Sequence, residues 1–184
     1  ESIKHHPTGM VQDMGIGYIP EDRHKDGLVL DFSIAENVIL GQHRKPLFAK
    51  HGLIMKKKEI GETAEHLREQ YDIRCSGIDS AASTLSGGNQ QKVVISKYID
   101  RNIRVLILDE PTRGIDVGAK DQIYEIIEGL AQQGMAVIVI SSEIPELQLM
   151  CDRICVMSQG KVTTVIDRSE FADSDNILRN AIGI

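Results

Sequence analysis

The stretch Val105-Leu-Ile-Leu-Asp-Glu-Pro-Thr112 decides the fold of this 184-residue chain. Its continuous apolar run is typical of a strand that is buried on both faces of a sheet. A helical pattern over Ile123–Leu130 and a second apolar run, Ala136–Ile140, follow it. Two buried strands joined by a crossover helix predict an α/β fold with a mainly parallel sheet. Asp109 and Glu110 then lie at the carboxyl end of a strand, where such folds bind their ligands.

The residues before this core predict a short strand, Gly15–Ile19, which Pro20 ends. The charged stretch Glu21–Gly27 has no apolar periodicity, so we expect an exposed loop there. Ser33 with Glu36 three residues later is a capping-box pattern and predicts the start of a short helix.

Two further helices are predicted between these strands, after a loop-rich connection at 41–55. The first helix has an apolar stripe whose inward residues are Ile60, Ala64, Leu67 and Tyr71. The second helix begins after Ser86, and its inward residues are Val93, Val94, Tyr98 and Ile99. Beyond the core we expect a hairpin of Ile154–Met157 and Lys161–Ile166, then a helix over Ser169–Ala181.

The composition excludes several classes of protein. The net charge of −6 and the 4% of aromatic residues, with no Trp, argue against nucleic acid as a partner. The longest apolar runs are strand-sized, far shorter than a membrane span. Three cysteines without a metal-like spacing predict reduced, mostly buried thiols in a cytosolic protein.

The segment Leu85-Ser-Gly-Gly-Asn-Gln-Gln-Lys92, called here the signature segment, suits an anion. A Ser-Gly-Gly turn that leads into a helix presents backbone N–H groups at the positive end of the helix dipole. Ser86 adds a hydroxyl, and Gly87 and Gly88 allow a phosphate to approach the backbone. The alternative is an ordinary helix N-terminus with flexible glycines.

Asp109 and Glu110 suit metal and acid–base chemistry. One carboxylate can hold Mg²⁺ through water and the adjacent one can polarise an attacking water. The alternative is a strand that ends in two solvated acids.

Taken together and in this order, the two segments resemble the signature and Walker B motifs of the ATP-binding cassette (ABC) family. Arg113-Gly-Ile-Asp116 resembles its D-loop, and Glu21 stands where the family has its Q-loop glutamine. The stretches around these motifs, with Ser141-Ser-Glu-Ile-Pro-Glu146, look like the second, C-terminal cassette of the tandem ATPase subunit of ribose- and galactose-type monosaccharide importers.

The resemblance implies one partial ABC nucleotide-binding domain over 1–184. Residues 1–40 form the core entry and Q-loop region, 41–100 a helical subdomain with the signature, and 101–184 the Walker B core and C-terminal hairpin. The cofactors are ATP and Mg²⁺. Asp109 is the implied metal ligand and Glu110 and Ser142 are catalytic, whereas the residues that contact nucleotide are Glu21, Ser86, Gly87, Gly88, Asn89, Gln90 and Asp116.

The chain also departs from the family pattern. It contains no Gly-x-x-x-x-Gly-Lys-Ser/Thr, so the resemblance implies a phosphate loop upstream of Glu1, and we expect these 184 residues alone to bind Mg-ATP weakly or not at all. Ser142 replaces the switch histidine and Glu21 replaces glutamine. We therefore expect the nucleotide site of this cassette itself to be degenerate. Its signature segment should instead complete the nucleotide site of the first cassette.

The partners that the resemblance implies are the N-terminal cassette, membrane permease subunits and, indirectly, a periplasmic or lipoprotein sugar-binding protein. The expected location is the cytoplasmic side of the cell membrane. Three alternatives stay open: an importer of nucleosides or other furanosides, a non-catalytic interaction module, and a DNA-repair or chromosome-type ATPase, which the acidic charge disfavours.

Overall fold

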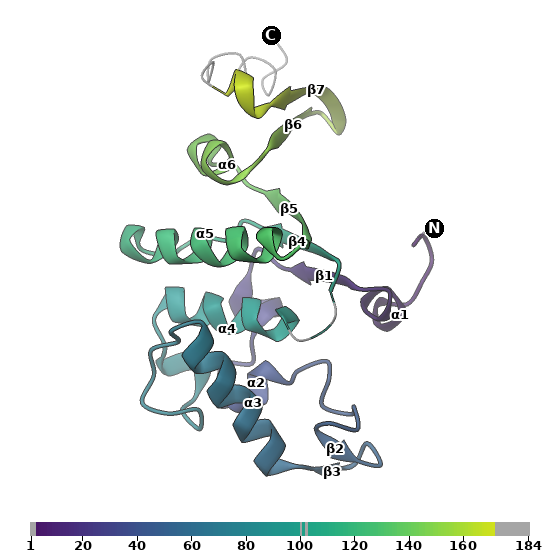
Figure 1. Ribbon diagram of the computed structural model, residues 1–184, viewed down its shortest axis with the longest axis vertical. Helices are drawn as coiled ribbons and strands as arrows, with labels where there is room; N and C mark the ends of the chain where they lie inside the picture. Colours follow the sequence, from purple (N-terminus) through teal and green to yellow (C-terminus); the bar gives the residue numbers. More distant parts are fainter. Residues whose placement is uncertain (1–2, 100, 102, 172–184) are drawn as a thin grey trace. The chain divides into compact units, whose positions relative to one another are not determined.

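The computed structural model describes residues 3–99, 101 and 103–171. The chain divides into two compact units, Glu1–Ile138 and Val139–Ile184. The first holds most of the sheet and the helical part, and the second holds a hairpin with its own small core (Figure 1).

The sheet has three strands in the order β1 (Ile16–Ile19), β4 (Val105–Asp109) and β5 (Ala136–Ile140). β1 and β4 pair in parallel, with Ile19 opposite Leu108. Helix α5 (Val117–Gln132) connects β4 to β5, and a short α1 (Thr8–Asp13) precedes β1. The predicted α/β fold with its parallel core is thus confirmed.

The predicted burial of the two apolar strands is only partly correct. In β4 Leu106 and Leu108 are fully buried, whereas the alternating residues are half-buried. In β5 the prediction is wrong for one face, because Ile138 and Ile140 are about half exposed. The described residues leave that face of β5 uncovered, and an apolar run by itself does not reveal which face has a neighbour.

The helical part contains α2 (Ile34–Val38), the two-residue strands β2 (Ala49–Lys50) and β3 (Ile54–Met55), α3 (Lys57–Gln70), the 3₁₀ turn η2 (Ala82–Thr84) and α4 (Gly87–Ile99). The capping box of α2 is confirmed, since Ser33 accepts from the Glu36 amide and the Glu36 carboxylate accepts from the Ser33 amide. A cluster of buried side chains joins α2 to α3: Ala35, Ile39, Phe48, Ile60 and Ala64.

The loop expected at Glu21–Gly27 is instead a turn of π-helix, η1 (Arg23–Gly27). Asp22 caps it by accepting from the amides of His24 and Lys25. Gly27 is buried against the side chain of Val94 in α4. The turn forms because a local acidic cap and a tertiary contact replace the apolar periodicity that an isolated helix needs.

The second unit consists of α6 (Ile144–Met150), β6 (Arg153–Ser158), β7 (Lys161–Asp167) and the 3₁₀ turn η3 (Arg168–Glu170). The predicted hairpin is confirmed, and Gln159 and Gly160 form its turn with φ of 50° and 75°. The expectation of mostly buried thiols is wrong, because Cys75 and Cys151 are only half-buried and Cys155 is exposed on the solvent face of β6. Most of the helix predicted over 169–181 lies outside the described residues.

Candidate functional site

The signature segment leads into α4, as the sequence predicts. Ser86 is exposed, and its Oγ accepts a hydrogen bond from Asn89 Nδ2 at 2.9 Å. The side-chain oxygen of Asn89 in turn accepts from the Arg74 amide at 2.9 Å. These two contacts hold the first turn of α4 so that the Ser86 side chain stays accessible to a ligand.

Gly87 and Gly88 are required by contacts within the chain. A Cβ on Gly88 would lie 2.7 Å from Ala119 Cβ in α5, and one on Gly87 would lie 2.9 Å from Arg23 Nη2 and 3.2 Å from the Gly114 carbonyl. The sequence interpretation assigned both glycines to phosphate approach. The structure adds a second reason, the close packing of α4 against α5 and the Arg113–Asp116 loop.

Arg23 joins the segments that lie far apart in the sequence. Its Nε donates to Gln90 Oε1 at 3.3 Å, while Nη1 donates to the Arg113 carbonyl at 2.8 Å and Nη2 to the Gly114 carbonyl at 3.4 Å. Burial lowers the pKa of its guanidinium from the usual value. One planar cation thus fastens η1 to the signature segment and to the D-loop, as only arginine can do with donors in a fixed fork.

Gln90 is buried and has a full set of contacts. Besides Arg23, its Oε1 lies 2.8 Å from His24 Nε2, and its Nε2 donates to the Ala82 carbonyl at 3.1 Å. The resemblance implies that Gln90 contacts nucleotide. Within the chain, its side-chain amide contacts η1 through Arg23 and His24 and η2 through the Ala82 carbonyl.

Asp109 lies at the end of β4, and its Oδ2 accepts a hydrogen bond from the Tyr18 hydroxyl at 2.9 Å. That bond and the nearby carboxylate raise the pKa of Tyr18. The Tyr18 carbonyl accepts from the Tyr98 hydroxyl at 2.7 Å, so α4 is connected through β1 to this carboxylate. Sequence reasoning missed Tyr18, because its contact with residue 109 depends on the pairing of β1 with β4.

Glu110 follows directly with φ of 46°, in the left-handed region that residues other than glycine seldom adopt. Its carbonyl accepts from the Arg113 amide at 3.1 Å, which closes a turn over the buried Thr112. Such local strain is concentrated at functional sites. The observation supports a functional position for Glu110 without assigning its role.

Asp116 and Glu21 both have contacts within the chain. Asp116 caps α5, since its Oδ1 accepts from the Ala119 amide at 3.0 Å. Glu21 forms an exposed ion pair with Arg113. The residue in the place of the Q-loop glutamine is therefore tied to the residue that opens the D-loop.

Ser142 belongs to the second unit, where it is exposed. Its neighbour Ser141 donates to the carboxylate of Glu146, which is 3% exposed, and accepts from the Glu143 amide at 3.0 Å. These contacts shape the start of α6.

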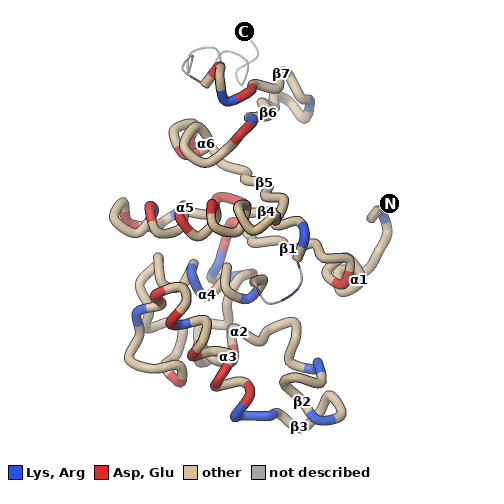
Figure 2. Tube along the Cα trace, in the orientation of Figure 1, with Lys and Arg blue, Asp and Glu red and all other residues tan. Residues whose placement is uncertain are grey.

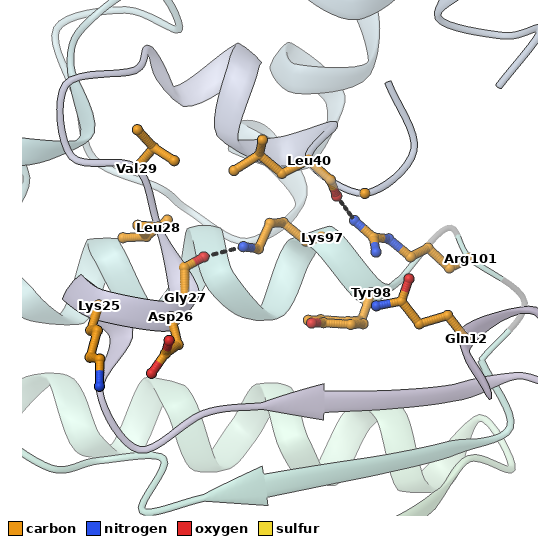
Figure 3. Close-up of a pocket in the computed structure, with 11 residues that line it drawn as sticks. Gln12, Lys25, Asp26, Gly27, Leu28, Val29, Leu40, Lys97, Tyr98 and Arg101 are labelled. Carbon is orange, nitrogen blue, oxygen red and sulfur yellow. Dashed lines mark hydrogen bonds between the residues drawn. The ribbon is translucent and has the colours of Figure 1, made fainter. Parts of the chain in front are cut away.

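A cavity of about 250 Å³ lies beside α4 in the first unit (Figure 3). Lys97 donates to the Gly27 carbonyl there, and Arg101 donates to the Leu40 carbonyl and lies over the ring of Tyr98 at 4.9 Å. Burial and, to a smaller extent, the nearby charge of Arg101 together lower the pKa of Lys97 to about 8. These cations stabilise the loops that follow η1 and α2.

The described residues contain no group of three or more side chains of the kind that enclose a metal ion. Magnesium needs no such group, since it usually binds through one or two carboxylates, water and substrate phosphates. Asp109, an oxygen donor at a strand end, fits that manner of binding. Among the described helices none is both long and apolar enough to cross a bilayer.

Comparisons with known proteins give matches in sequence and in fold. A family model described as "ABC transporter" matches residues 5–113. The ribose import ATP-binding protein RbsA of Lactococcus lactis subsp. cremoris (strain SK11) is 43% identical over 169 residues, 92% of this chain and 34% of that protein. The L-arabinose transport ATP-binding protein AraG of Geobacillus stearothermophilus is 46% identical over 165 residues, 90% of this chain and 31% of that protein.

The chain therefore spans about a third of the length of the curated relatives it matches. Two solved structures share its fold. An ATP-binding cassette of an ABC transporter in its ADP conformation has a TM-score of 0.78 at 20% identity, covering 100% of this chain and 74% of its own. A dimeric post-hydrolysis cassette bound to ADP and Pi has a TM-score of 0.69 at 22% identity, covering 88% and 66%.

Proposed function

The chain belongs to the ABC transporter family, and from this premise we propose that the full protein hydrolyses ATP to drive import of a simple sugar. The relatives that match are named for ribose and L-arabinose import, which supports a pentose-sized substrate. We further propose that the chain is the second of two cassettes, and that phosphate loops lie in parts of the protein outside these 184 residues.

The observation that carries the proposal is the Arg23 junction. Hydrogen bonds from this one side chain join the signature segment to the D-loop, and a Cβ added at Gly87 would meet both Arg23 and the Gly114 carbonyl. A preorganised face with oriented N–H and hydroxyl donors stabilises the charge that develops on phosphate oxygens. Ser86, Gly87, Gly88 and Asn89 would supply that face to the partner cassette, with Asp116 beside them.

Within the chain's own site, Asp109 is the residue that fits as a ligand of Mg²⁺, and Tyr18 orients its carboxylate. The ion, when bound with ATP, neutralises charge on the phosphate oxygens. Glu110 would orient or polarise the attacking water, with Ser142 in the place of the switch residue. The ion pair of Glu21 with Arg113 supports a site of reduced activity, because Glu21 is engaged by its neighbour.

The partners follow from the same proposal. They are the first cassette, membrane permease subunits and, through these, a periplasmic or lipoprotein sugar-binding protein. The protein then lies on the cytoplasmic side of the cell membrane. A second candidate is a module that only completes the partner's site, which the Glu21–Arg113 pair and Ser142 favour.

Steady-state ATPase of the full transporter tests the assignment. Ser86→Glu places a negative charge against phosphate, and we expect a loss of about 10²–10³-fold in rate. Glu110→Gln acts in the weaker site, so we expect less than about a tenfold loss. Ser83→Glu, an exposed serine three residues upstream, is the matched control and leaves the rate unchanged.

The opposite pattern, in which Glu110→Gln abolishes turnover and Ser86→Glu does not, would make this cassette's own site the productive one. If Glu110→Gln had no effect at all on the rate, the second candidate would be favoured, namely a module that only completes the partner's site. Thermal melts of each variant check that it folds.

A further inference from the structure

Residues 41–58, called here the basic hairpin, concentrate positive charge in an acidic chain. They contain six lysines and arginines and no acid, so the rest of the chain carries a net −12 against the overall −6. The cations are Arg44, Lys45, Lys50, Lys56, Lys57 and Lys58. Figure 2 shows them as blue segments around β2 and β3 and at the start of α3. The bordering acids are Glu36 and Glu59.

These cations make few fixed contacts. Lys56 donates to the Pro46 carbonyl at 2.8 Å, and Lys58 lies 3.8 Å from Glu62 in an exposed pair. In the part of the chain that the structure describes, the side chains of the other four have no hydrogen bond or ion pair and are exposed. Their charges are thus available to interact with a negatively charged surface.

The same hairpin exposes apolar side chains. The exposed fraction is 84% for Leu53, 66% for Ile54 and 57% for Leu47. β2 and β3 pair through Lys50 and Ile54, and the turn between them is His51-Gly52 in left-handed conformations. The apolar residues therefore lie at and beside the tip of a paired element.

The base of the hairpin is firmly packed. Phe48 is 3% exposed and belongs to the buried cluster with Ile39 and Ile60, and Ala49 is 1% exposed. The hairpin therefore combines a packed base, an apolar tip and flanking cations without an acid among them, and interfacial membrane-binding segments likewise combine apolar with cationic side chains. Exposed apolar side chains that gather in one place mark interaction sites, whereas isolated ones are ordinary.

We propose that the basic hairpin binds the surface of an anionic lipid bilayer, with Leu53 and Ile54 entering the interface and the cations on lipid phosphates. The inference rests on the proposed function, which places the protein beside a membrane permease. The negative potential of a cytoplasmic leaflet matches the charge of the hairpin, and each lysine near such a surface strengthens binding about fivefold.

Vesicle co-sedimentation of the full-length protein without nucleotide tests the proposal. We expect binding to an equal mixture of phosphatidylglycerol and phosphatidylcholine at about 0.1 M salt, where the Debye length is about 10 Å. Binding should fall sharply at about 0.5 M salt and be absent with phosphatidylcholine alone. Lys50→Gln/Lys57→Gln should weaken it by roughly 25-fold.

A matched pair of double variants tests whether the effect depends on where in the chain the charge and the apolar group are removed. Lys50→Gln/Leu53→Ser removes one charge and one exposed apolar group from the basic hairpin, and we expect roughly tenfold weaker binding or more. Lys161→Gln/Val162→Ser makes the same change on the exposed β6–β7 hairpin, where Val162 is also more than half exposed, and should leave binding intact. Thermal melts check the fold of both.

Equal binding to neutral and anionic vesicles, or equal losses from the two matched variants, would overturn the proposal. Binding that requires permease in the vesicles, whatever the lipid charge, would assign the hairpin to an acidic protein surface instead. Because the assay contains no ATP, loss of ATPase with intact vesicle binding would count against the proposed function alone.

Discussion

Arg23 is the residue whose side chain connects the most distant parts of the candidate site. Three of its nitrogens donate to Gln90, to the Arg113 carbonyl and to the Gly114 carbonyl. Lysine has no planar fork and cannot reach all three acceptors at once. Arg23 is therefore a positioning residue for the signature segment and the D-loop.

Arg23→Gln should lower the free energy of unfolding by about 1–2 kcal/mol, because one charge-assisted hydrogen bond to the buried Gln90 and two to exposed backbone carbonyls are lost. We expect kcat to fall in the full transporter while KM for ATP changes little, since the face would be misplaced in the transition state. Arg23→Lys should recover only part of the loss. Urea unfolding and steady-state kinetics measure the two effects.

Lys25→Gln is the control for Arg23, since Lys25 is an exposed cation in the same turn of η1. If Arg23→Gln behaves like Lys25→Gln in both measurements, the positioning role is wrong. A loss of stability without a change in kcat would reduce Arg23 to a structural residue.

At the scale of elements, α4 connects the helical part of the first unit to its sheet. Its N-terminus carries the signature segment, its middle packs Val93, Val94 and Ile95 fully buried, and its last turns carry Lys97 and Tyr98. One helix thus carries the signature segment at its start and two residues that line the cavity at its end.

Lys97 makes the stability of this element dependent on pH. Burial lowers its pKa to about 8 in the folded protein from the usual 10.5, so between these values the unfolded chain binds more protons. The free energy of unfolding then rises with pH in that window. From pH 7.5 to 9 we expect Lys97 to contribute an increase of about 1 kcal/mol.

Comparison with Lys97→Met isolates this contribution, since all other groups titrate in both proteins. Urea unfolding at the two pH values should show the stability difference moving in favour of the wild type as pH rises. Lys161→Met, at an exposed site, should track the wild type. A difference independent of pH would show that Lys97 has an ordinary pKa.

At the scale of the whole molecule, the proposed tandem arrangement makes association depend on nucleotide. The signature segment and D-loop are polar and exposed at Ser86, Arg113 and Asp116, so they bury little apolar surface against a partner. We expect the first cassette to bind this one only when ATP bridges them.

Analytical ultracentrifugation of the separately produced cassettes, with and without Mg-ATP, measures this dependence. Ser86→Glu should abolish the effect of ATP, whereas Ser83→Glu should retain it. Equal association in both conditions would contradict bridging by nucleotide.

Local patterns in the sequence determined much of this protein. The capping box of α2, the turn at Gln159-Gly160, the amphipathic α3 and the strand–helix order from Val105 to Ile140 all depend on neighbouring residues, and all are confirmed. The motif order of the signature segment and Asp109-Glu110 also predicted the family. Short-range spacing suffices for these features because the interactions that form them are short-range.

Tertiary structure alone decided how the site is held together. The three acceptors of Arg23 are separated from it by 67, 90 and 91 positions in the sequence. Tyr18 and Asp109, which share a hydrogen bond, are separated by 91 positions. Gly88 must be glycine because a Cβ there would clash with Ala119, and that contact also depends on the tertiary structure. So does the burial that lowers the pKa of Lys97. Such contacts depend on strand pairing and helix packing, which bring distant residues together in space, and no periodicity along the chain encodes which partner each one meets.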